Sequence, residues 1–215
     1  MEVFGDLEKS KKLGTFHFLR RQQAVAKKSH FCLSDFIAPR DSTKIDYLGA
    51  FAVCAGSGVE KMAHEFEEQN DDYSSIMVKA LGDRFAEAMA ELAHKKVREW
   101  WTYGMKENLS NEALIKEEYQ GIRPASGYPS QPDHTEKDII WELLSVEENI
   151  GLKLTESRAM NPGCSVSGLY FSNPQSTYFN VGSLGKDQVE DYAVRKGWSK
   201  EEAMKWLRPN LGFKE

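Results

Sequence analysis

Hydrophobic residues recur every three or four positions through the middle of the chain, which is the spacing of one face of an α-helix. The stripe consists of Met77, Leu81, Phe85, Ala88 and Leu92. It predicts a long amphipathic helix over residues 72–101, with this stripe facing the core. Charged residues follow the same period on another face: Asp83, Glu87, Glu91 and His94. A charged helix face of this kind is usually solvated.

Segments with the pattern of β-strands lie on both sides of this helix. Alternation around His17 predicts a half-buried strand over residues 15–19, and an apolar run predicts a buried strand over residues 47–53. The last third predicts strands over residues 152–155, 166–171 and 177–181. We therefore expect a single α+β domain over residues 1–215, a twisted antiparallel β-sheet with helices packed against it.

Capping residues indicate four shorter helices. Ser110 and Thr135 are expected to cap helices that end near residues 119 and 144. Asp187 is expected to cap a helix over residues 188–195, and Ser199 to begin the last helix with a capping box. The segment before Thr135 contains three prolines and two glycines over residues 120–133, so it predicts a loop with an imposed shape.

Composition narrows the class of protein. The chain has 215 residues, of which 40% are hydrophobic and 28% charged, which is typical of a globular domain. No apolar run approaches the roughly 20 residues of a membrane span, and the charged N-terminus does not resemble a signal peptide. We expect a cytoplasmic protein. The net charge of −5 argues against nucleic acid as the main partner.

The common catalytic and metal-binding motifs do not occur. Cys32, Cys54 and Cys164 form no C-x-x-C pair, and His64 and Glu65 lack the second histidine of H-E-x-x-H. The sequence contains neither a Walker A motif nor a G-x-S-x-G motif around a serine. We therefore expect no metal site and no catalytic residue in this chain.

The loop sequence R-P-A-S-G-Y, residues 123–128, has the chemistry to hold a small zwitterionic ligand. Pro124 favours an extended Arg123, whose guanidinium can bind a carboxylate through two parallel hydrogen bonds. Gly127 allows close approach of the backbone, and the Tyr128 ring suits an apolar or cationic group such as a sulfonium. Proline- and glycine-rich loops with an arginine are also common as purely structural elements.

The run R-P-A-S-G-Y-P-S-Q-P-D-H-T-E-K, residues 123–137, resembles the signature of the activation domain of cobalamin-dependent methionine synthase. Further segments resemble that family in the same order: residues 33–39, 46–53, 64–73, 153–157, 166–172 and 187–193. The resemblance extends from about residue 19 to residue 213, which makes chance agreement implausible.

The resemblance implies a binding site for S-adenosylmethionine, formed by Glu87, Arg123, Ala125, Gly127, Tyr128, Tyr178 and Phe179. In that family the arginine holds the methionine carboxylate, and an acidic residue on the long helix contacts the methionine end. The backbone of the loop and the aromatic pair near the C-terminus hold the adenosine.

The resemblance also implies a role in methionine biosynthesis from homocysteine, by reductive methylation of the inactive cob(II)alamin cofactor. Cobalamin would be bound by a separate corrinoid-binding module, zinc would belong to the homocysteine module, and a flavodoxin-like or flavoprotein donor would supply the electron. The chain alone is then not a complete methyltransferase, because it lacks D-x-H-x-x-G and a zinc-binding cysteine cluster.

Two alternatives remain open at the level of sequence. The N-terminal part of the family domain, which carries a further acidic ligand contact, has no counterpart here, so the chain can be a docking or scaffold domain that no longer binds S-adenosylmethionine. It can also be a reactivator of another corrinoid methyltransferase.

Overall fold

The chain divides into two compact units in the computed structural model, which describes residues 1–22 and 29–214. The first unit comprises Met1–Gly49, Gly121–Ile139 and Leu169–Glu215, and the second comprises Ala50–Gln120 and Ile140–Gly168. Helices are combined with small antiparallel sheets, which confirms the expected α+β class. Within the described residues the sheets are two-stranded: β1–β2, β3–β6 and β4–β5.

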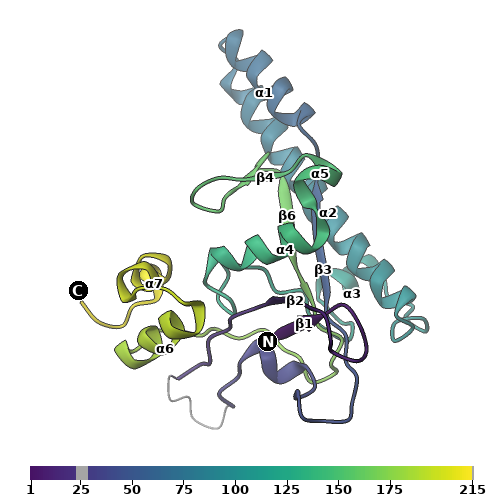
Figure 1. The fold of residues 1–215 in the computed structure, drawn as a ribbon. Helices are drawn as coiled ribbons and strands as arrows, with labels where there is room; N and C mark the ends of the chain where they lie inside the picture. The colour runs from purple at the N-terminus through teal and green to yellow at the C-terminus, as the bar shows by residue number, and fades with distance from the viewer. Residues whose placement is uncertain (23–28, 215) are drawn as a thin grey trace. The chain divides into compact units, whose positions relative to one another are not determined.

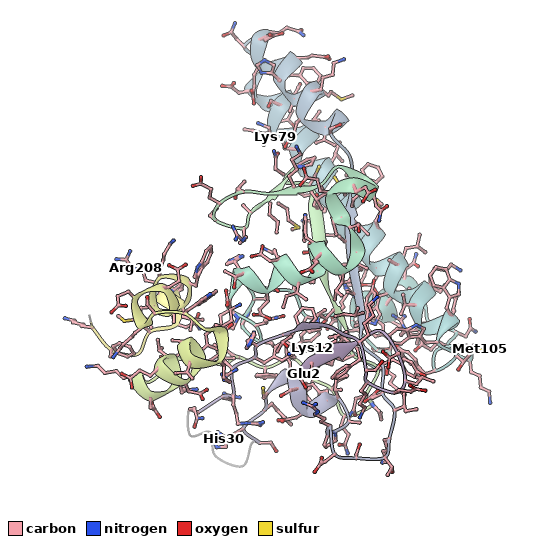
Figure 2. The ribbon with its side chains drawn as sticks, in the orientation of Figure 1. Glu2, Lys12, His30, Lys79, Met105 and Arg208 are labelled. Carbon is pink, nitrogen blue, oxygen red and sulfur yellow. The ribbon has the colours of Figure 1, made fainter. Side chains whose placement is uncertain are left out.

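The first unit begins with an antiparallel hairpin of β1 (Glu2–Phe4) and β2 (Lys12–Thr15), drawn side by side in Figure 1. Glu2 and Lys12, labelled in Figure 2, form an ion pair at 3.0 Å. The predicted strand over residues 15–19 was wrong in extent, because the ladder ends at Thr15. The alternation is nevertheless present, since Phe16 and Phe18 are buried while His17 is only partly covered.

Short helices complete the first unit: η1 (Leu33–Phe36), η2 (His134–Glu136), α6 (Lys186–Lys196), α7 (Lys200–Leu207) and η3 (Arg208–Asn210). The helices α6 and α7 pack against each other, as Figure 1 shows in yellow. The cap of α6 is Gly185, so the prediction that Asp187 occupies this position was wrong. Ser199 caps α7 as predicted, because its side chain accepts a hydrogen bond from the Glu202 amide.

The second unit contains the long helix α2 (Asp72–Trp100), which ends within one residue of its predicted limit. It is preceded by α1 (Gly58–Glu68) and followed by α3 (Asn111–Ile115) and α5 (Val146–Ile150). Lys79 of α2, labelled in Figure 2, lies 2.7 Å from Glu67 of α1. The hydrogen bond from Lys79 lowers the pKa of Glu67 to about 2. α3 is shorter than expected, because Glu117 takes a φ of +55° shortly after its end.

The remaining elements are β3 (Gly49–Cys54), β4 (Lys153–Leu154), β5 (Met160–Asn161), β6 (Ser165–Tyr170) and α4 (Lys137–Leu144). The positions of β3, β4 and β6 confirm the strands expected near residues 47–53, 152–155 and 166–171. Ala55 donates to the Cys164 carbonyl at 3.0 Å just beyond β3 and β6. No strand forms over residues 177–181, so that prediction was wrong.

The buried face of α2 differs from the predicted one. The residues expected to face the core are exposed, with Phe85 at 65% and Leu81 at 55%. A row of mainly small residues is buried instead: Ser75, Gly82, Ala86, Ala90, His94 and Arg98. A Cβ atom added to Gly82 would lie 2.8 Å from Val59 Cγ1, so this face packs too closely for large side chains.

The packing of α2 can be tested by placing the same larger side chain on its two faces. Ala90→Leu is expected to lower the free energy of unfolding by about 1–3 kcal/mol, because Ala90 has no exposed surface. Ala88→Leu, on the exposed face, is expected to change it by less than about 0.5 kcal/mol. Urea unfolding of both variants measures the difference. Equal effects would contradict the assignment of the two faces.

Candidate functional site

The loop that carries R-P-A-S-G-Y is anchored on both sides of its arginine. Ile122 exchanges two backbone hydrogen bonds with Phe171, each 3.0 Å long, and the Pro124 carbonyl accepts from Leu169 at 3.0 Å. Arg123 therefore lies between two fixed residues, and its own amide donates to the Tyr178 hydroxyl at 3.1 Å. These hydrogen bonds hold the backbone at Arg123 in place.

The next residues form a tight turn that presents Tyr128. The Gly127 amide donates to the Gln131 carbonyl at 2.7 Å, and the Gln131 amide donates to the Tyr128 carbonyl at 2.8 Å. Gly127 has a φ of +93°, and an added Cβ would lie 2.1 Å from His134 Cε1. Only glycine fits here, for both conformational and steric reasons. The Tyr128 side chain stays 62% exposed at the tip of the turn.

The segment that contains the predicted aromatic pair is tied to this loop. Ser130 Oγ donates to the Phe179 carbonyl at 2.6 Å and accepts from the Phe179 amide at 3.1 Å. The Val181 amide donates to the Pro129 carbonyl at 2.9 Å. Tyr178 and Phe179 are therefore brought beside the loop by hydrogen bonds to it, although they belong to no strand.

A hollow of about 480 Å³ opens beside this segment. It is lined by Arg21, Ser29, Phe31, Thr177, Tyr178, Phe179 and Asn180. The volume falls within the range of small-molecule sites, and aromatic faces with a few polar groups are their usual lining. Phe31 and Phe179 contact each other with ring centroids 6.0 Å apart, which makes one wall aromatic.

A buried carboxylate, that of Glu136, lies shortly after the loop in sequence. Glu136 has no exposed surface, and it accepts from the His17 amide at 2.7 Å and from Lys196 Nζ at 2.6 Å. Lys196 also donates to Thr135 Oγ1 at 2.9 Å and lies 3.4 Å from Asp133 Oδ2. Both charges are thus paired and hydrogen-bonded, which is the condition for burying an ion pair.

Asp133 is the second acidic member of this cluster. It caps η2 by accepting from the Thr135 amide at 2.8 Å, so the prediction that Thr135 is the cap was off by two residues. The Tyr192 hydroxyl donates to Asp133 Oδ2 at 2.6 Å. Burial, followed by the charge of Asp133, raises the pKa of Tyr192 far above its usual value, so the phenol stays protonated and keeps donating.

The site residues predicted from sequence fall in both units. Arg123, Ala125, Gly127 and Tyr128 lie on the anchored loop, and Tyr178 and Phe179 lie on the segment bonded to it, all in the first unit. Glu87 belongs to the second unit, where it is exposed on α2. Their role in ligand binding stays a prediction.

The sequence did not point to the other residues of the hollow, among them Arg21, Phe31 and Asn180. They come from segments about 150 residues apart, and no local spacing connects them. Two buried polar side chains in the loop were also missed. Among the described residues, Ser126 Oγ and the Gln131 amide atoms have no hydrogen-bond partner within the protein, which is uncommon for buried polar groups.

Metal ligands, thiols and membrane-spanning helices are the other features that bear on function. Among the residues that the structure describes, no group of three or more His, Cys, Asp or Glu side chains is arranged to hold a metal ion. The three cysteines carry free thiols, and burial raises the pKa of Cys164. Over the described ranges, no helix has the length and apolarity needed to cross a membrane.

Comparison with known families identifies the family to which the chain belongs. The model of the family described as vitamin B12 dependent methionine synthase, activation domain, matches residues 1–197. The chain belongs to this family. This activation domain is also similar to a solved structure of the MetH reactivation domain bound to AdoHcy, with 55% sequence identity and a TM-score of 0.97.

The two chains differ in length. The match covers 99% of this activation domain and 66% of the AdoHcy-bound chain, so the present chain spans just under two thirds of that relative. The family resemblance inferred from residues 123–137 and the collinear segments is confirmed.

The requirement for glycine at position 127 can be tested by adding a single methyl group there. Gly127→Ala is expected to destabilise the activation domain by about 2–4 kcal/mol, from the positive φ and the overlap with the His134 ring. Gly163→Ala is the matched control, because nothing lies within 4 Å of an added Cβ and its φ is not in the strained range. Chemical denaturation of the two variants tests this, and equal stability would contradict it.

His134 gives the first unit a pH dependence. Lys137 Nζ lies 2.9 Å from His134 Nδ1, and burial together with the Lys137 charge lowers the pKa of His134. The folded state then favours neutral histidine, so the unfolded state binds more protons as the pH falls below about 6.5.

We expect stability to be fully present above about pH 6.5 and to decrease as the pH falls through that value toward the lowered pKa. Replacing His134 with Asn removes this titration. Unfolding free energies at pH 5.5 and pH 7.5 should therefore differ more for the wild type than for His134→Asn. An identical pH dependence of the two proteins would contradict this role of His134.

Proposed function

We propose that this activation domain binds S-adenosylmethionine, and its demethylated product AdoHcy, at the loop of residues 123–128 and the hollow beside it. The observation that carries the proposal is the relative bound to AdoHcy, which is 55% identical over 99% of this chain. The anchored loop, the aromatic hollow and the buried unsatisfied groups of Ser126 and Gln131 support it.

Each predicted site residue can be assigned a contact with the ligand. Arg123, held between two anchored neighbours, would bind the ligand carboxylate with its guanidinium. Gly127 and Ala125 would offer backbone to the nucleoside, and the exposed ring of Tyr128 would lie against it. A contact of Glu87 with the methionine end of the ligand stays a prediction from the family resemblance.

The aromatic segment would receive the adenosine. Tyr178 is 43% exposed and Phe179 is 8% exposed, so one offers an accessible ring and the other a fixed wall. The ring of Phe31 adds to that wall. A hollow of about 480 Å³ has room for a nucleoside, and stacking on aromatic rings would orient the base.

The biological role we propose is reductive methylation in methionine biosynthesis. When bound, S-adenosylmethionine supplies an electrophilic methyl group for the reduced corrinoid, which is carried by another module. The residues of this chain bind and orient the ligand, so their contribution is one of position rather than of acid or base catalysis. The corrinoid-binding module and a flavodoxin-like or flavoprotein electron donor are the partners in this proposal.

One observation favours a second candidate. The chain spans only 66% of the AdoHcy-bound relative, so any ligand contact that the remaining part of that relative makes would be missing from this chain. A docking domain that keeps the fold with weak ligand binding would have the same structure. The two candidates differ in measurable affinity.

Calorimetric titration of the chain with S-adenosylhomocysteine separates them. We expect saturable binding in the wild type and a loss on the order of 2–3 kcal/mol in Arg123→Ala, roughly 30- to 150-fold in affinity, because a charged hydrogen-bonded contact is removed.

Arg208→Ala is the control for a general loss of positive charge, since Arg208 is exposed at η3. Unchanged binding in that variant is expected. A flat titration of the folded wild type at high ligand concentration would favour the docking domain, and equal binding by wild type and Arg123→Ala would exclude the proposed role of the arginine.

A further inference from the structure

A line of large apolar side chains is exposed along α2. This α2 stripe consists of Tyr73, Met77, Leu81, Phe85, Met89 and Leu92, whose exposed fractions are 74, 45, 55, 65, 42 and 57%. At 100° per residue, Met77, Leu81, Phe85 and Leu92 lie within about 80° of one another around the helix axis, and Tyr73 and Met89 flank this face at its two edges. At a rise of 1.5 Å per residue, the stripe extends over roughly 29 Å.

The area of the α2 stripe is large for a free surface. Half-exposed side chains of this size each present on the order of 100 Å², which gives roughly 600 Å² in all. Soluble proteins seldom expose a contiguous apolar patch larger than a few hundred Å² unless it binds something.

Rotation of α2 does not offer another way to bury these side chains. The opposite side of the helix is already packed through Gly82, Ala86 and Ala90. The 2.8 Å approach of a Gly82 Cβ to Val59 leaves no space there for leucine or phenylalanine. The helix therefore has two apolar sides, one of small residues that is covered and one of large residues that is not.

We infer that the α2 stripe is the docking face for an amphipathic helical segment from the part of the family domain that lies outside this chain. The AdoHcy-bound relative carries about a third of its length beyond the match, which is enough chain to cover a 20-residue helix face. Anchors at every third or fourth position are the pattern by which one helix packs on another. The inference rests on family membership and is independent of ligand binding.

The test uses the chain as it is and the unmatched third of the AdoHcy-bound reactivation domain, produced as a separate polypeptide. Sedimentation velocity and calorimetry should detect a one-to-one complex. The double variant Leu81→Asp/Phe85→Asp should weaken it at least a hundredfold, because two charges would be buried at the contact. Val194→Asp on α6 is the matched control, because Val194 is an isolated apolar residue that is 80% exposed. It should leave the affinity unchanged.

A second measurement addresses the case in which the unmatched third does not bind the chain when it is a separate polypeptide. The same third is fused to the chain through a flexible linker, and chemical unfolding is compared with and without Leu81→Asp/Phe85→Asp. We expect the fusion to raise the denaturation midpoint of the wild type and not that of the double variant. An absence of both complex and stabilisation would overturn the inference, as would equal behaviour of the double variant. A dimer of the chain that Leu81→Asp/Phe85→Asp dissociates would overturn it in favour of a second copy.

Discussion

The burial of Glu136 is the constraint on which the motif loop depends. A carboxylate without exposed surface is stable only if its charge is balanced and its oxygens are hydrogen-bonded. Lys196 provides the charge and the His17 amide a hydrogen bond, so three segments far apart in sequence are held at one point. Removing one partner of such a pair typically costs about 3–5 kcal/mol, because the other charge stays buried. The loop of residues 123–131 is attached to this point through Asp133 and the turn of η2.

A loop fixed in this way suits a ligand that must be held in one orientation. Backbone hydrogen bonds hold the residues on both sides of Arg123, and the Gly127 turn is closed by Gln131. Little conformational freedom remains to be lost when a ligand binds, so more of the contact energy appears as affinity. Methyl transfer to a group on another module depends on alignment, and a preorganised loop reduces the entropic cost of that alignment. In the function we propose, the residues of this site contribute position rather than acid or base catalysis.

The sequence predicted lengths and boundaries better than it predicted contacts. The limits of α2 followed from its period, but its buried side did not, because a row of small residues gives a weaker hydrophobic signal than Leu81 and Phe85. Ser110 and Ser199 were identified as caps from local chemistry, which depends on near neighbours. Nothing in the sequence near Glu136 indicates that Lys196 reaches it across 60 residues. The loop residues were found through family resemblance, whereas Phe31 and Arg21 required the fold.

The two sides of α2 explain why its buried face was predicted wrongly. Small residues let α2 approach its neighbours closely, so that side is fixed by shape and tolerates little change. Large residues on the other side carry most of the hydrophobic signal, and a single-chain interpretation assigns them to the core. When a domain is completed by additional chain, such a signal points to the surface where that chain belongs.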